Sequence, residues 1–101
     1  MSDAYYETVA TSELARLANA LEIVDRRAEL NRRYRKLIHD SRALLAQPTV
    51  RLTQARGIAK KLMVLVKAAG TTFRDELEPQ QAHVLDDGLA QANELVYETG
   101  A

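Results

Sequence analysis

The chain has 101 residues, no cysteine, and 14 basic residues against 14 acidic ones. This length predicts a single domain over residues 1–101, and the absence of cysteine excludes disulfides, thiolate metal sites and cysteine catalysis. The first residues lack the apolar core of a secretory signal, and no apolar stretch reaches the roughly 20 residues of a membrane span. We therefore expect a cytoplasmic protein without a membrane partner. Residues 1–10, which include Tyr5 and Tyr6, are expected either as a disordered tail or as an apolar lid on the helices.

The first expected helix covers residues 11–46. Leu14 and Leu17 begin an apolar stripe with the three- and four-residue spacing of one helix face. From Leu30 onward the stripe lies on a different face, which leaves two interpretations: a long helix that wraps around its partners, or a break near residues 25–28. Because no glycine or proline interrupts the segment, we predict one continuous helix.

Two prolines mark the starts of two further helices. Pro48 precedes a second periodic segment that is expected to end just before Pro79, and Pro79 begins a third segment that Gly100 terminates. Gly57 and Gly70 lie inside the second segment. We interpret both as positions where another helix approaches closely, with a bend near Gly70 as the alternative.

These segments predict an all-α fold, an elongated antiparallel three-helix bundle with a long helix 1 and shorter helices 2 and 3. Helices of roughly 36, 29 and 20 residues would have very unequal lengths. The third would then leave the hairpin tip, residues 36–57, covered by two helices alone. Apolar residues at such a tip need a second chain as cover, which predicts a homodimer. The interface residues expected on this basis are Leu44, Leu45, Val50 and Leu52.

The charge is zero in sum but unevenly distributed along the chain. Residues 1–25 hold five acids and one arginine, residues 26–67 hold twelve basic residues and two acids, and residues 68–101 hold seven acids and one arginine. Three interpretations are open: the helices neutralise one another, the basic region binds nucleic acid, or it binds an acidic protein surface. The expected basic patch consists of Arg26, Arg27, Arg32, Arg33, Arg35, Lys36, Arg42, Arg51, Arg56, Lys60 and Lys61.

The sequence contains no motif that predicts catalysis. His39 and His83 fall on different expected helices, and His83 with Asp86 and Asp87 along one helix is more typical of an exposed surface than of a metal site. No phosphate-binding glycine loop or nucleophile elbow occurs. We therefore predict a non-enzymatic protein with no metal and no cofactor.

The helical layout is similar to that of the small all-α chorismate mutases, which combine a long first helix, two shorter ones, dimerisation, and arginines that hold a dicarboxylate. Pro48 and Arg51 carry this similarity. However, Leu52 follows where that family has a glutamate, and the third segment lacks the matching terminal glutamine. We therefore transfer no catalytic residue from this family.

Two functions remain open from the sequence. The first is a non-enzymatic helical interaction or adaptor protein that acts through protein–protein contacts as a homodimer, with an acidic protein as a further candidate partner. The alternative is a nucleic-acid-binding accessory factor that uses the basic residues of the 26–67 region.

Overall fold

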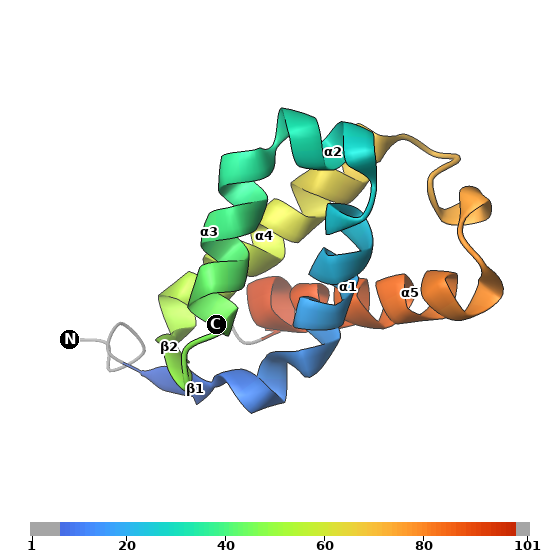
Figure 1. Cartoon of the computed structure of the whole chain (residues 1–101). Helices are drawn as coiled ribbons and strands as arrows, with labels where there is room; N and C mark the ends of the chain where they lie inside the picture. The colour runs from blue at the N-terminus through green and yellow to red at the C-terminus, as the bar shows by residue number, and fades with distance from the viewer. Residues whose placement is uncertain (1–6, 99–101) are drawn as a thin grey trace.

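The computed structural model describes residues 7–98, which form five α-helices and one two-stranded sheet (Figure 1). The predicted all-α class is confirmed in outline, but five helices form where the sequence predicted three, and the sheet was not predicted. The described residues contain no helix with both the length and the apolar character needed to cross a membrane. In chain order the elements are β1 (Thr8–Ala10), the 3-10 helix η2 (Thr11–Leu14), α1 (Ala15–Asp25), α2 (Ala28–Arg33), α3 (Arg35–Leu45), β2 (Thr49–Arg51), α4 (Leu52–Ala69), the 3-10 helix η3 (Arg74–Glu76), α5 (Pro79–Asn93) and a π-helical turn, η4 (Glu94–Glu98).

The predicted continuous first helix is wrong, because the chain turns twice between α1 and α3 (Figure 1). Arg27 has an extended backbone with ψ of 107°, and Tyr34 departs from helical geometry at φ −120° and ψ 31°. These turns explain the shift of the apolar stripe. They allow Leu21 of α1, Leu30 of α2 and Ile38 of α3 to reach one core, whereas a straight helix would point the later residues away from it.

The second predicted helix also ends earlier than expected. Gly70 follows α4 with φ of 96°, a left-handed conformation that glycine adopts at little cost. Phe73 therefore lies in the connection to α5 and not on α4. The predicted close approach is wrong at both glycines, because a Cβ added at Gly57 or at Gly70 would meet no atom within 4 Å.

Two helices do approach closely at Gly88, on α5. A Cβ at this position would lie 2.1 Å from the Cβ of Ala20 and 2.8 Å from the backbone oxygen of Arg16, both on α1. Leu17 and Leu85 are fully buried in the core that α1 and α5 share with α4. Glycine is thus required here because it lets the two helix backbones come together.

Gln91 ties the same two helices together through hydrogen bonds. Its side chain is buried. The backbone N–H of Leu17 donates to its Oε1 at 2.8 Å, and its Nε2 donates to the backbone oxygen of Glu13 at 2.6 Å. Gln91 therefore satisfies polar groups at the start of α1 that the helix itself leaves unpaired.

The hairpin end is covered by the chain's own N-terminal segment. β1 pairs antiparallel with β2, and Val9 lies opposite Val50. Thr11 strengthens this connection, since its Oγ1 donates a hydrogen bond to the backbone oxygen of Gln47 at 2.6 Å. The segment that the sequence suggested as a tail thus includes a strand from Thr8 onward, whereas Tyr5, Tyr6 and Gly100 lie outside the described residues.

This cover removes the reason for expecting a second chain at the hairpin end. Val50 and Leu52 are only 3% and 7% exposed, both within the single chain. Leu44 and Leu45 are half-buried and pack against the core. Val50 and Leu52 are therefore not open apolar surface in the single chain, and an interface at these four residues stays a prediction.

Candidate functional site

A groove opens where α1, α2 and α3 meet, with a volume of about 610 Å³. Asp25 at the end of α1 and Asn31 on α2 line one side of it. Arg35, His39 and Arg42 line it from α3. A smaller hollow of about 200 Å³ between α1 and α3 shares Arg42 with this groove, so the depression continues along α3.

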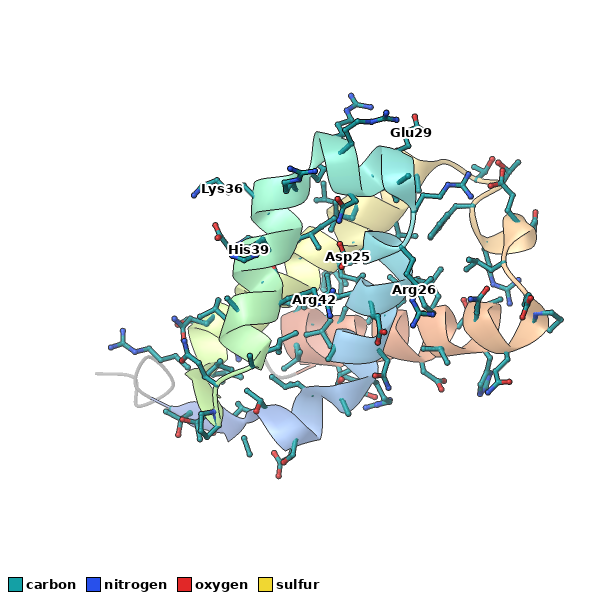
Figure 2. All side chains as sticks on the ribbon, in the orientation of Figure 1. Asp25, Arg26, Glu29, Lys36, His39 and Arg42 are labelled. Atoms are coloured by element: carbon teal, nitrogen blue, oxygen red, sulfur yellow. The ribbon has the colours of Figure 1, made fainter. Side chains whose placement is uncertain are left out.

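Asp25 joins the three helices through its carboxylate. Its Oδ1 accepts a hydrogen bond from Nδ2 of Asn31, and its Oδ2 accepts one from the guanidinium of Arg42. Figure 2 shows Asp25 and Arg42 pointing toward one another between α1 and α3. The side chain of Asp25 is 21% exposed and that of Arg42 is 50% exposed. Because water reaches Arg42, this pair orients the side chains more than it stabilises the fold.

A surplus of positive charge lies at the corner between α2 and α3, where we define Arg32, Arg33 and Lys36 as the basic corner. All three side chains are exposed. The guanidinium of Arg33 lies 5.5 Å from the ring centroid of Tyr34, and Lys36 Nζ is 3.6 Å from Asp40 Oδ2. Over residues 7–98, Arg32 and Arg33 form no ion pair with a carboxylate.

Two other arginines of the predicted basic patch are neutralised within the chain. Arg26 pairs with Glu22 at 2.8 Å along α1. Arg27 pairs with Glu76 of η3, and its guanidinium lies 5.4 Å from the ring centroid of Phe73. These contacts support the interpretation of internal neutralisation for this part of the patch, since both guanidinium groups already have acidic partners.

The remaining members of the predicted patch lie on β2 and α4, away from the basic corner in the chain. Arg56 is half-buried, and its Nε donates a hydrogen bond to the backbone oxygen of Leu95 at 3.2 Å. Arg51 and Lys60 are exposed, whereas Lys61 is half-buried. The structure therefore divides the predicted patch into a corner, a groove and separate side chains.

The ion pair between Arg74 and Asp86 shifts the pKa values of both side chains. Nε of Arg74 lies 3.0 Å from each carboxylate oxygen of Asp86, and its NH2 lies 2.7 Å from Oδ2. This hydrogen bonding lowers the pKa of Asp86 and raises the pKa of Arg74. The pair connects η3 to α5, and it neutralises the charge of Asp86, one of the two acidic residues of α5.

The groove brings together residues that the sequence analysis did not connect. Asp25 and Asn31 were assigned to one continuous helix, and His39 was not linked to them. The shift of the apolar stripe was the signal that could have found this site, because a break between α1 and α2 folds Asn31 back toward Asp25. Among residues 7–98, no group of three or more histidine or acidic residues is placed to hold a metal ion.

No protein-family model, curated protein or solved structure is similar to this chain. The charge and the geometry of the described residues are therefore the guide to its function.

Proposed function

We propose that this protein is a non-enzymatic interaction protein whose basic corner binds an acidic surface of a partner protein. The observation that carries the proposal is that Arg32 and Arg33 are exposed and form no ion pair with a carboxylate over residues 7–98, although Glu29 lies on the same helix. By contrast, six other Lys or Arg side chains of the described residues, among them Lys36 of the corner itself, form ion pairs with Asp or Glu. Exposed cations that form no ion pair attract a partner of opposite charge and favour its approach in the correct orientation.

The scarcity of exposed apolar side chains supports an electrostatic mode of binding. Over residues 7–98, Val64 on α4 and Tyr97 near the C-terminus are the exposed large apolar residues. A contact surface around Arg32 and Arg33 would thus gain little from apolar burial. Its affinity should fall steeply with salt, because exposed charges are screened over about 10 Å at 0.1 M ionic strength.

Nucleic acid is the second candidate partner, favoured by the chemistry of the same corner. Arg32 and Arg33 present planar guanidinium groups that can bind phosphate oxygens through paired hydrogen bonds. Binding of this kind depends on charge and does not require an apolar interface. It would be independent of nucleotide sequence, because phosphate contacts carry no sequence information.

One binding experiment tests both partner classes. Fluorescence anisotropy would be measured with a labelled Glu-rich peptide, with single-stranded DNA and with duplex DNA, at about 50 mM and about 200 mM salt. The double variant Arg32→Glu/Arg33→Glu should abolish binding at the lower salt. The control Arg51→Glu/Lys60→Glu makes the same change of net charge at exposed positions outside the basic corner.

The outcomes separate the possibilities. Binding of the peptide but not of DNA supports the protein partner, and the reverse supports nucleic acid. Equal losses in both double variants would refute a localised site, because net charge alone would then explain the binding. Wild-type protein that binds none of the three probes at the lower salt would refute the basic corner as a binding surface.

We also propose self-association, through complementary charge and not through an open apolar hairpin tip. The basic corner and Asp87 of α5, whose neighbour Asp86 is already paired with Arg74, offer complementary charge for a contact between two copies. Light scattering at about 50 mM and about 200 mM salt tests this contact, and a dimer that dissociates at the higher salt is the expected result. A monomer at both salt concentrations would refute it.

A further inference from the structure

Three side chains on one face of α3 give the groove the character of an oxyanion site. Arg35, His39 and Arg42 follow one another at spacings of four and three residues, and all three line the groove. The two arginines stand two helical turns apart, about 10 Å along the helix axis, with the imidazole between them. Arg35 and His39 form no ion pair with any other residue of the 7–98 segment.

The carboxylate in the groove does not cancel this positive charge. Asp25 is already bound by Arg42 on one oxygen and by Asn31 on the other. A guanidinium has five N–H donors, so Arg42 keeps donors for a ligand after this contact. Two arginines against one carboxylate leave a net charge of plus one in the groove.

We propose that this groove binds a diphosphate group, carried by a nucleoside diphosphate or by inorganic pyrophosphate. Guanidinium groups bind phosphate oxygens in paired hydrogen bonds. Arg35 and Arg42 flank His39 along the row, and a diphosphate, whose oxygens are spread over two phosphorus atoms, spans more of this row than a single phosphate does. This binding of a small molecule goes beyond the proposed docking of a macromolecule.

The volume and the lining residues of the groove agree with a ligand larger than the diphosphate alone. A volume of about 610 Å³ lies within the range of about 300–1,000 Å³ that is usual for small-molecule sites. Ala43 is exposed and contributes apolar surface beside the charged row, whereas Ile38 lines the groove but is only 1% exposed. A sugar or base attached to the diphosphate therefore has both space and apolar surface to contact.

Isothermal titration calorimetry of the full chain at low salt tests the inference with ADP, pyrophosphate and orthophosphate as probes. We expect the two diphosphates to bind, and orthophosphate to bind at least about tenfold more weakly. Arg35→Gln and His39→Gln should each weaken ADP binding about ten- to a hundredfold, the effect of losing a charge-assisted hydrogen bond. The control Lys60→Gln removes an exposed cation outside the groove and should bind ADP as the wild type does.

Circular dichroism and thermal melting would first show that the variants fold, which is expected because Arg35 and His39 are exposed. ADP that binds more tightly than pyrophosphate supports a nucleoside diphosphate as the ligand, and equal affinities support recognition of the diphosphate itself. Three results would overturn the inference: no heat with either diphosphate at millimolar concentration, orthophosphate that binds as tightly as pyrophosphate, or equal losses in Lys60→Gln and Arg35→Gln. The basic-corner variant Arg32→Glu/Arg33→Glu should still bind ADP, so this site and the proposed docking surface can fail separately.

Discussion

Replacing Gly88 by alanine tests the closely packed contact of α1 with α5. The new methyl group would lie 2.1 Å from the Cβ of Ala20 and 2.8 Å from the backbone oxygen of Arg16. Carbon atoms in favourable contact lie about 3.5–4.0 Å apart, so the two helices would have to separate by about 1.5 Å at this point. One of the clashing atoms belongs to the backbone of α1, and a side-chain rotation therefore cannot relieve the clash.

The expected loss of stability follows from two opposing contributions. Overpacking of a core costs about 1–3 kcal/mol and occasionally more. Alanine in place of glycine inside a helix returns about 1 kcal/mol. Separation of the helices would also loosen the packing of Leu17 against the core, which places the cost at the upper end of the range. We therefore expect Gly88→Ala to lower the free energy of unfolding by about 2 kcal/mol.

Urea denaturation followed by the circular dichroism of the helices measures this free energy by linear extrapolation. Gly57→Ala is the matched control, because no atom lies within 4 Å of its added Cβ, and it should stabilise the protein by about 0.5–1 kcal/mol. Adding Ala20→Gly to Gly88→Ala should recover part of the loss, since it removes the nearer clashing atom. A Gly88→Ala variant as stable as the wild type would refute the close approach.

Three further predictions concern polar contacts between elements. Gln91→Leu leaves the backbone N–H of Leu17 without its acceptor in the core. It should lower the free energy of unfolding, measured by urea denaturation, by about 2–3 kcal/mol. An unchanged urea midpoint would contradict this prediction. Asp25→Ala removes the acceptor shared by α2 and α3. It should lower the free energy of unfolding by only about 1–2 kcal/mol, because Arg42 is half exposed and is hydrated by water once the carboxylate is gone. A gain in stability would contradict this prediction. The hydrogen-bonded arginine lowers the pKa of Asp86, so the pair stabilises the fold above the unfolded pKa of about 3.9 and loses this contribution as the pH falls through the folded value. The difference in urea midpoint between wild type and Asp86→Asn should therefore shrink below about pH 4 and stay constant near neutral pH; a difference that grows on acidification would contradict this.

The sequence alone determined the class of the fold and the faces that become buried. Leu14 and Leu17 were predicted to begin one apolar face, and both are buried. Pro79 was predicted to begin a helix, and it is the first residue of α5. These predictions succeed because helical periodicity and the fixed φ of proline act over a few neighbouring residues, without any contribution from distant parts of the chain.

The tertiary structure alone decided where the long apolar segment breaks and which glycine brings helices together. No glycine or proline marks the turn at Arg27 in the sequence. The turn allows Leu30 to be buried in the core that α4 and α5 complete. Gly88 becomes critical only because α1 crosses α5 at that residue. The groove depends on the same turn, which brings Asn31 to Asp25. Contacts between residues far apart in the chain fixed each of these features, and a local pattern carries no information about such contacts.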